Sequence, residues 1–418
     1  MFTSLYDHGY VFTGHKPEQG INLIGVLSPM NRRDYLRFTV AGGSLGLVGC
    51  TNFTYRNDVN STDHPDGHMN YSGPLELPVP RDKLTRGAER DAIPAIVDPV
   101  FDTDWSGLTI ETQYDLGPFG EQPKYIQIEP RLEEDDLIIG VVRNAQARAY
   151  PFRILNWHEV VNDNFFGPLL VSYCPLCGSG VTAVRKAGGE ISNFGVSGLL
   201  FRNGLVMYDE KTESLWSQLY ATAISGELTG EGLKFEHATV TTWENWGDEN
   251  PDTLVLRPPP DSGTIVPDVI PRNYTRNPYA SYQRSSQIGL GGESRDDRLH
   301  PKTEVIGIEH GGVARAYPVD EVRKEGVIND EVGSRPVVVT TTAGGSPVAY
   351  IREVENSAVY FTSNDENHLM GGGSRWLRST GTAVDGPHEN TRLEPANDIS
   401  PLYWFAWITI HPGSSLYE

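Results

Sequence analysis

The sequence predicts a β-rich α+β fold of two related lobes, built from short strands with a few short helices. Three observations predict it. The chain has 44 glycines and 29 prolines, which favour many turns over long helices. Its apolar runs are short and bounded by turn residues, as strands are. Finally, the chain contains an internal repeat, which indicates duplication of one structural unit.

The repeat is the most informative of these observations. The sequence ARAYP at residues 147–151 recurs at 314–318, and Asn-Asp at 162–163 recurs at 329–330 without a gap in the alignment. Each copy also closes on two tryptophans, Trp243 and Trp246 in the first copy and Trp404 and Trp407 in the second. We therefore expect a first lobe over residues 84–260 and a second lobe over 261–418.

Most of the expected elements in the first copy are strands. The strand candidates are residues 137–143, 147–152, 169–174, 180–184, 190–196 and 205–209, which are separated by Gly, Pro or Asn turns. Residues 154–162 favour a short helix, because Leu155, His158 and Val161 follow helical spacing.

Residues 30–50 resemble an export signal with a lipid attachment site. Arg32 and Arg33 precede an apolar stretch, and the segment closes on a small residue before Cys50. Paired arginines are typical of the twin-arginine route. The apolar run is well short of the roughly 20 residues that a spanning helix needs. We therefore expect Cys50 to carry a lipid that anchors the protein to the outer face of the cytoplasmic membrane.

The residues that flank the signal carry two further expectations. Residues 1–29 lack a charged-then-apolar pattern, so we expect the start at Met30 and regard 1–29 as a mis-annotated extension. Residues 51–83 are polar and rich in turn formers, which predicts a linker between lipid and fold. Acceptor sequons in this linker make Asn52, Asn60 and Asn70 candidate glycosylation sites.

The net charge of -21, with 34 basic and 55 acidic residues, constrains the partners. Such a surface repels the phosphates of nucleic acids, so we exclude nucleic-acid binding. High acidity together with the twin-arginine signal and its lipid attachment site is typical of an extremely halophilic archaeon. At molar salt the Debye length is about 3 Å, which screens this self-repulsion.

Cys174 and Cys177 are the only cysteines besides Cys50, and three hypotheses remain open for them. The first is a structural disulfide, although a loop this short gains only about 2 kcal/mol from chain entropy. The second is thiol–disulfide exchange, although Gly178-Ser179-Gly180 is a poor start for the helix that lowers the thiol pKa in such proteins.

The third hypothesis is a metal site. The sequence CPLCG at residues 174–178 is similar to a zinc knuckle, and His158 is the nearest further ligand candidate. Two Cys and one His leave an open position on zinc, as in catalytic sites. The same ligands suit copper. His158, Glu159, Asp163 and Asp209 are the candidate catalytic groups. The alternative for each of the three carboxylates is a plain surface role.

The repeat supplies an internal control for these candidates. The second copy has Glu325 at the position of His158, and Thr342 and Gly345 at the positions of Cys174 and Cys177. Framework residues occur in both copies, whereas the His and both Cys occur in the first alone. This pattern predicts one active copy and one degenerate copy.

Several motifs together resemble the uncharacterised family called domain of unknown function 3179. They are residues 91–95 (DAIPA), 149–151 (AYP), 156–159 (NWHE), 173–178 (YCPLCG), 196–200 (VSGLL) and 215–217 (LWS), with Tyr274 and Pro278-Tyr279 later in the chain. The resemblance runs from about residue 85 to the C-terminus and implies His158, Cys174 and Cys177 as candidate positions. It implies no reaction. Residues 369–373 depart from the pattern, because an Asp like Asp209 is expected there.

These observations give two hypotheses from different classes. The leading one is an exported, lipid-anchored redox protein that depends on a metal or on thiols, with its site at His158, Cys174 and Cys177. The alternative is a non-catalytic cell-surface binding or scaffold lipoprotein with a structural Cys pair.

Overall fold

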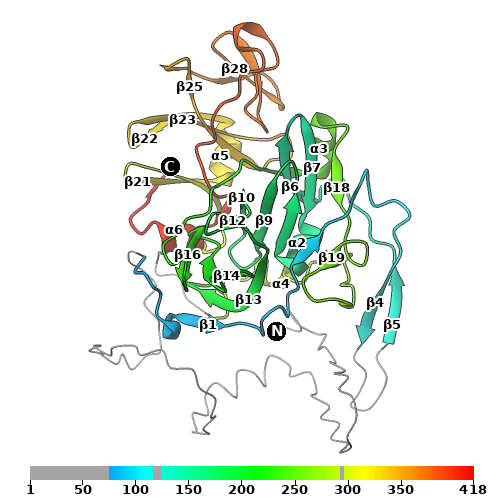
Figure 1. Ribbon diagram of the computed structural model, residues 1–418. Helices are drawn as coiled ribbons and strands as arrows, with labels where there is room; N and C mark the ends of the chain where they lie inside the picture. Colours follow the sequence, from blue (N-terminus) through cyan, green and yellow to red (C-terminus); the bar gives the residue numbers. More distant parts are fainter. Residues whose placement is uncertain (1–74, 116–123, 292–295) are drawn as a thin grey trace, which may run out of the picture. The chain divides into compact units, whose positions relative to one another are not determined.

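The computed structural model describes residues 75–115, 124–291 and 296–418 (Figure 1). Of the described residues, 75–112, 127–291 and 296–418 belong to one compact unit, which therefore holds both sequence repeats. The other unit is described only at residues 113–115 and 124–126, within the paired strands β4 (Ile110–Asp115) and β5 (Lys124–Ile128).

The first copy contributes three sheets of five strands each. In spatial order, the first sheet is β17 (Thr239–Thr242), β6 (Leu137–Arg143), β7 (Gln146–Pro151), β18 (Leu254–Leu256) and β3 (Phe101–Asp102). The second is β10 (Ser179–Val184), β9 (Pro168–Cys174), β8 (Val160–Asn164), β2 (Ile96–Asp98) and β19 (Gly263–Thr264). The third is β1 (Leu84–Arg86), β13 (Phe194–Phe201), β14 (Gly204–Asp209), β15 (Leu215–Ser217) and β16 (Thr222–Ser225).

The second copy contributes three smaller counterparts of these sheets. They are β30 (Leu402–Tyr403), β20 (Glu304–His310), β21 (Val313–Pro318) and β31 (Ser415–Leu416); then β22 (Val327–Val332), β23 (Arg335–Thr341) and β24 (Pro347–Ile351); then β27 (Thr362–Ser363), β28 (His368–Gly371) and β29 (Ser374–Leu377). Two further pairs of strands are β11 (Lys186–Ala187) with β12 (Glu190–Ile191), and β25 (Glu353–Val354) with β26 (Ser357–Ala358).

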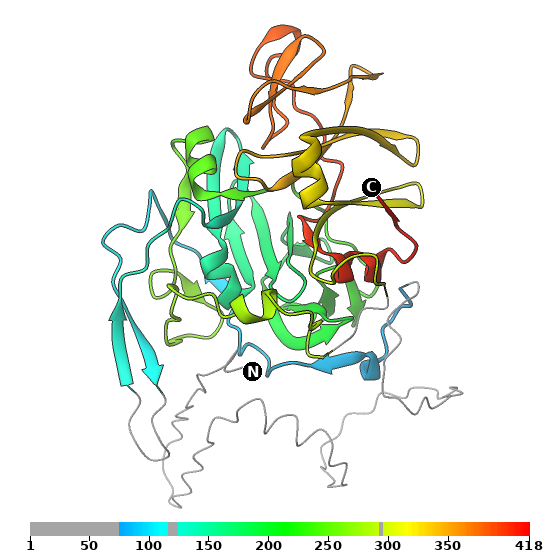
Figure 2. The ribbon, with the colours of Figure 1, turned by 180° about the vertical axis from the view of Figure 1, so that it is seen from behind.

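The helices are short. They are α2 (Phe152–His158), α3 (Trp243–Glu249), α4 (Ala280–Gln283), α5 (Val319–Glu325) and α6 (Trp404–Ile410), with 3-10 turns at Arg81–Lys83 and Gly386–His388. Helices α2 and α5 occupy equivalent places after β7 and β21, and α3 and α6 occupy equivalent places near the end of each copy. Figure 2, the view from behind, shows α4 in yellow-green in front of the green strands of the first copy.

The internal repeat is confirmed down to single contacts. In the first copy β18 pairs parallel with β7, and in the second copy β31 pairs parallel with β21. The side-chain amide of Asn162 exchanges two hydrogen bonds with the backbone of Phe194. Asn329 makes the same pair of bonds with Phe361. Each amide therefore ties one sheet of its copy to the next.

The predicted α+β class with two lobes is wrong. Strands hold 42% of the described chain and helices 12%, and the six larger sheets form a six-bladed β-propeller. Helices α2, α3, α5 and α6 have seven residues each, about two turns. Each of these short helices lies next to a single strand in the chain. The helices therefore cannot form a separate helical layer, as an α+β fold would have. The duplication therefore produces three blades per copy.

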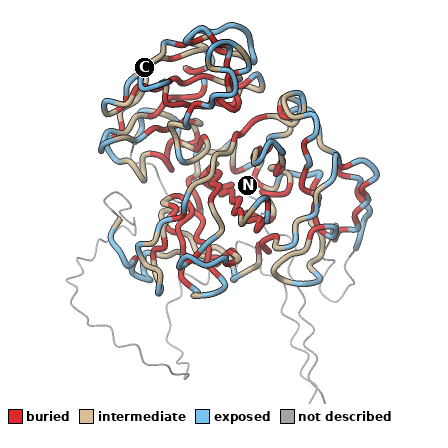
Figure 3. The backbone as a smooth tube through the Cα atoms, turned by 45° about the horizontal axis from the view of Figure 1, so that its top comes forward, coloured by how far each residue is buried: buried red, intermediate tan, exposed pale blue. Residues whose placement is uncertain are grey.

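Burial follows the strands, as Figure 3 shows by its buried stretches between exposed turns. Trp216, Trp246, Trp376 and Trp404 are among the largest fully buried side chains. The predicted helix at 154–162 begins and ends earlier, at Phe152–His158. Glu159 adopts a left-handed backbone that stops the helix, and the β-branched Val160 and Val161 then begin β8.

Several predictions fall outside the described residues. These are the extension at 1–29, the signal at 30–50, Cys50 and the sequons at Asn52, Asn60 and Asn70. Within the described ranges, no helix combines the length and apolar character that crossing a membrane requires.

Candidate functional site

Cys174 and Cys177 lie in a tight turn between β9 and β10, called here the Cys turn (residues 174–178). The backbone N–H of Cys177 donates to the carbonyl of Cys174 at 3.0 Å, as in a β-turn. Gly178 then adopts a φ of +67°, which glycine tolerates without strain, and leads into β10. Both cysteines are free thiols, and their exposed fractions are 2% and 0%.

The two thiols of the Cys turn differ in acidity. Burial raises the pKa of Cys174, but hydrogen bonds from the Cys177 side chain and from the backbone N–H groups of Leu205, Cys177 and Leu176 outweigh it. The pKa of Cys174 is therefore lowered. Burial and the neighbouring Cys174 and Glu159 raise the pKa of Cys177 well above its usual value. Cys174 is therefore the more acidic of the two thiols.

Glu159 is the acid of the site. It caps the C-terminus of α2 in a left-handed backbone with φ of +57°, a conformation unfavourable for a side chain with a Cβ. Its exposed fraction is 6%. Burial and the nearby Cys174 raise the pKa of its carboxyl well above the usual value, which favours the protonated form. The hydroxyl of Tyr279 donates to its Oε1 at 3.3 Å.

Three tyrosines outside the first copy's repeat contact the Cys turn or Glu159 beside it. We call Tyr279, Tyr282 and Tyr403 the tyrosine cover. The hydroxyl of Tyr282 donates to the carbonyl of Leu176 at 2.7 Å. The backbone N–H of Tyr403 donates to the carbonyl of Cys177 at 2.9 Å, and an ideal Cβ on Gly178 would lie 3.1 Å from the Tyr403 ring. Helix α4 and the second copy therefore close over thiols that the first copy supplies.

A buried lysine fastens one member of the cover. The ammonium of Lys302 lies 3.3 Å from the centre of the Tyr282 ring and donates to the backbone carbonyls of Tyr282 and Ser285. Burial lowers the pKa of Lys302 to about 8. These bonds fix the end of α4 over the Cys turn.

His158 is fully buried, and both ring nitrogens have protein partners. Nδ1 lies 2.7 Å from the carbonyl oxygen of Pro94, and Nε2 lies 2.8 Å from the hydroxyl of Tyr274. Burial lowers its pKa to about 3, so the ring is neutral. His158 therefore locks α2 to residues 94 and 274 as a core side chain.

The predicted zinc or copper site does not fit this arrangement. Neither ring nitrogen of His158 is left for a metal ion, because each already meets a backbone or hydroxyl oxygen. Across residues 75–115, 124–291 and 296–418, no group of three or more His, Cys, Asp or Glu side chains is placed to hold a metal ion.

The other two predicted acid–base groups, Asp163 and Asp209, form hydrogen bonds with residues away from the thiols. Asp163 accepts hydrogen bonds from Arg148 and from the Tyr150 hydroxyl, at 2.6 Å each. Asp209 accepts from the backbone N–H of Lys211 and Thr212 and from the Trp216 indole. Both carboxylates are buried, so a surface role is excluded for them. Their hydrogen bonds serve the framework. Of the three predicted carboxylates, Glu159 is the one beside the thiols.

Sequence reasoning missed the tyrosine cover as part of the site. Tyr279 stood in the family motif Pro278-Tyr279, which was the one available signal. Tyr282 and Tyr403 lie roughly 100 and 230 residues from the Cys turn along the chain, so only the fold brings them together.

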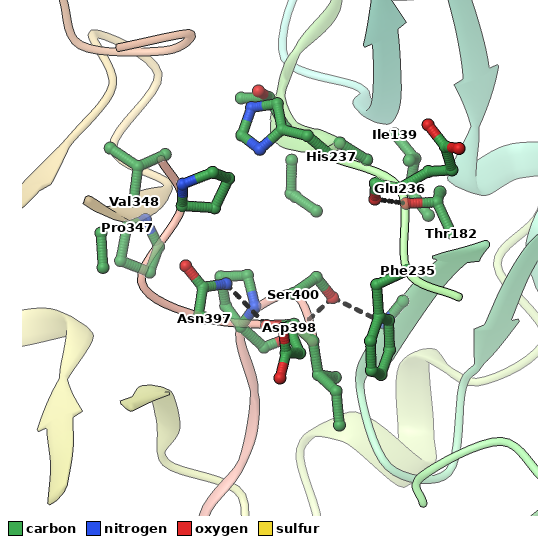
Figure 4. Close-up of a pocket in the computed structure, with 18 of the residues that line it drawn as sticks. Ile139, Thr182, Phe235, Glu236, His237, Pro347, Val348, Asn397, Asp398 and Ser400 are labelled. Atoms are coloured by element: carbon green, nitrogen blue, oxygen red, sulfur yellow. Dashed lines mark hydrogen bonds between the residues drawn. The ribbon is translucent and has the colours of Figure 1, made fainter. Parts of the chain in front are cut away.

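A cavity of about 250 Å³ lies between the two copies, apart from these side chains. The first copy contributes residues around His237, and the second contributes the start of β24 and residues 395–401 (Figure 4). The Nε2 of His237 is buried without a hydrogen-bond partner. The hydroxyl of Ser400 accepts the backbone N–H of Gly180 at 2.6 Å, so one wall of the cavity is tied to the strand that follows the Cys turn.

The comparison with family models identifies the chain. The model described as "Protein of unknown function (DUF3179)" matches residues 90–414, so the chain belongs to that family. No curated protein and no solved structure matches the chain. The family assignment confirms the resemblance drawn from the motifs and supplies no reaction.

Proposed function

We propose that this member of the DUF3179 family is an exported, lipid-anchored thiol–disulfide redox protein whose centre is Cys174 and Cys177. One observation carries the proposal. Two buried thiols of opposite pKa shift share a β-turn beside a proton-holding carboxyl. A purely structural pair needs neither the split in acidity nor the acid.

The turn geometry suits reversible disulfide formation. The ends of a β-turn lie within about 7 Å of each other between Cα atoms, and disulfides span roughly 4.4–6.8 Å. The bond can therefore close with little movement of β9 and β10. Closing a loop this short stabilises the fold by only about 2 kcal/mol, which also leaves the bond reducible.

The reaction balances in protons and electrons. Cys174 and Cys177 form an S–S bond and release two protons and two electrons to an oxidant, and reduction reverses these changes. Glu159 is the group next to Cys174 that can exchange a proton during this step. Tyr279 fixes the orientation of that carboxyl by donating to Oε1.

The predicted location supports this assignment. An export signal at residues 30–50 and a lipid on Cys50 would put the protein outside the cytoplasm, where thiols are oxidised unless a reductant maintains them. Replacing Cys50 with Ser should release the protein from the membrane fraction. Retention of that variant in the membrane would refute the anchor without affecting the redox proposal.

An equilibrium titration in dithiothreitol redox buffers tests the redox proposal. We expect one reversible two-electron transition. It is monitored by counting the free thiols of the full chain at each potential. Cys177→Ser should abolish the transition, and Thr342→Ser at the equivalent turn of the second copy should leave it intact. Thiols that stay reduced at every potential would refute the proposal.

The cavity supports a second candidate, a small-molecule binding protein. A buried imidazole nitrogen without a partner is costly unless a ligand or water meets it. Binding of a small polar ligand should raise the melting temperature of the wild-type protein and not of His237→Phe. If no member of a polar-metabolite screen shifts the wild-type melting temperature, this candidate fails.

A further inference from the structure

The burial of the thiols limits what can oxidise them. Cys174 and Cys177 are 2% and 0% exposed, and the tyrosine cover closes over the turn that carries them. A disulfide on another protein must bring its sulfur into line with the attacking thiolate, which this cover prevents. The oxidant that reaches Cys174 is therefore a small molecule.

The charges around the centre limit the oxidant further. The chain carries a net charge of -21, and Glu159 lies beside a cysteine that favours its thiolate form. An anionic oxidant would meet repulsion both at the surface and at the centre. The hydroxyls of Tyr279 and Tyr282 already donate to Glu159 and to the Leu176 carbonyl, so the cover adds no cation that would attract an anion. These observations favour a small uncharged polar oxidant.

The groups at Cys174 suit cleavage of an O–O bond. That cleavage needs a thiolate nucleophile and a proton for the departing oxygen. Backbone N–H groups of Leu205, Cys177 and Leu176 surround the Cys174 sulfur, and Glu159 holds the proton. Cys177 is next to the sulfur and retains its own proton, ready for the second step.

We propose that the oxidant is a small uncharged hydroperoxide, such as hydrogen peroxide, and that Cys174 is the sulfur it oxidises. The inference rests on the proposed redox function. The Cys174 thiolate attacks one peroxide oxygen, the O–O bond breaks, and the departing oxygen leaves as water or an alcohol with the proton of Glu159. Cys174 becomes a sulfenic acid.

Cys177 completes the oxidation. Its thiol attacks the Cys174 sulfur, an S–S bond forms, and the sulfenic oxygen leaves as water. The sulfenic hydroxyl keeps its own hydrogen, and the thiol proton of Cys177 supplies the other hydrogen of that water. Solvent reprotonates Glu159. A small dithiol then reduces the disulfide by two electrons and returns both thiols.

The fraction of Cys174 that is ionised to thiolate determines how much faster than free cysteine it should react with peroxide. A free cysteine with a pKa of about 8.5 is roughly 3% thiolate at pH 7, so a fully ionised Cys174 reacts about 30-fold faster on that ground alone. Glu159 should add to this factor by protonating the departing oxygen. The rate should therefore exceed that of free cysteine, and about 30-fold is the most that the thiolate fraction alone can contribute.

The experiment uses the reduced full chain and hydrogen peroxide. We expect thiol loss faster than for free cysteine at pH 7, with up to about 30-fold of the increase coming from the thiolate fraction. In Cys177→Ser, dimedone should label Cys174 as a sulfenic acid, detected by mass spectrometry. Glu159→Gln should slow oxidation and change its pH profile, whereas Glu325→Gln, an exposed carboxyl at the equivalent helix end, should not.

A parallel reaction with oxidised dithiothreitol separates the two proposals. If that disulfide oxidises the pair while peroxide reacts no faster than with free cysteine, the peroxide inference falls and the redox function stands. If neither reagent oxidises the pair, the redox function itself falls. Tyr279→Phe gives a milder test than Glu159→Gln, because it removes only the hydroxyl that meets the carboxyl. Unchanged melting temperatures would show that both variants fold.

Discussion

The two copies share a framework and differ in chemistry. Arg148, Tyr150 and Asp163 of the first copy recur as Arg315, Tyr317 and Asp330, with the same hydrogen bonds to the carboxylate. The comparison teaches that repeated residues hold the blades together. Residues that differ at equivalent positions therefore point to function.

The differences gather at one place. Thr342 opens the second copy's turn where Cys174 opens the first, and in both turns the amide three residues on donates back to its carbonyl. Gly326 ends α5 with φ of +72°, where Glu159 ends α2 in a left-handed backbone. The second copy thus uses glycine where that backbone is free of strain. The first copy accepts a strain of about 1–2 kcal/mol to place a carboxyl beside the thiols.

The largest expected effect comes from the thiols. Cys174→Ser should abolish reversible oxidation completely, because no second sulfur remains in reach of Cys177. Thr342→Ser, the matched change in the second copy, should leave oxidation unchanged. Thiol counting after oxidation and reduction measures both. Residual reversible oxidation in Cys174→Ser would break the assignment of chemistry to the first copy.

A pair of glycines tests the shared framework. An ideal Cβ on Gly140 would lie 2.5 Å from the Trp246 ring, and one on Gly307 would clash with Trp407 in the same way. Overpacking of this kind costs about 1–3 kcal/mol, so Gly140→Ala and Gly307→Ala should destabilise the fold by similar amounts. Urea unfolding measures the change. If both variants are as stable as the wild type, the contacts of these two glycines with tryptophan are not tight and equivalent.

The equivalent carboxylates Asp163 and Asp330 should differ in how much each contributes to the free energy of unfolding. The Asp163 side chain is 4% exposed and that of Asp330 is 20% exposed. We expect Asp163→Asn to cost about 2 kcal/mol and Asp330→Asn about 1 kcal/mol, since leaving a buried charge unpaired costs more. Denaturant unfolding gives these values. Loss of thiol oxidation in a folded Asp163→Asn would restore that residue as a catalytic candidate.

The smallest effect concerns pH. The folded state raises the pKa of Glu159 above its unfolded value near 4.5, so Glu159 stabilises the fold most below that pH and progressively less as pH rises. The groups that face it are Cys174, Cys177 and Tyr279. Between pH 4.5 and 8, wild type should lose stability relative to Glu159→Gln. A constant difference across this range would show that Glu159 ionises as an exposed carboxyl does.

Local patterns predicted much of the first copy. The run at 137–143 is β6 as expected, and the candidates at 147–152, 169–174, 180–184 and 205–209 each match a strand within one residue. The candidate at 190–196 instead divides between β12 and β13. The hydrophobic periodicity of a strand and the turn residues that bound it are local properties of the sequence, which explains the agreement.

The closure of the blades and the tyrosine cover could not be predicted this way. Both depend on contacts between distant segments, such as Tyr403 on Cys177. His158 shows the same limit, because Pro94 and Tyr274 satisfy a side chain whose spacing suggested a metal ligand. The expected Asp near residue 371 is absent because the Gly371 carbonyl accepts the Trp376 indole, as Asp209 accepts that of Trp216.

The most direct test of the central claim is to map the thiols of the wild-type chain through one full cycle. We expect a Cys174–Cys177 disulfide after mild oxidation, both thiols restored by a small dithiol, and no change in the fold. A disulfide that resists reduction in the folded chain, or thiols that never pair, would contradict it.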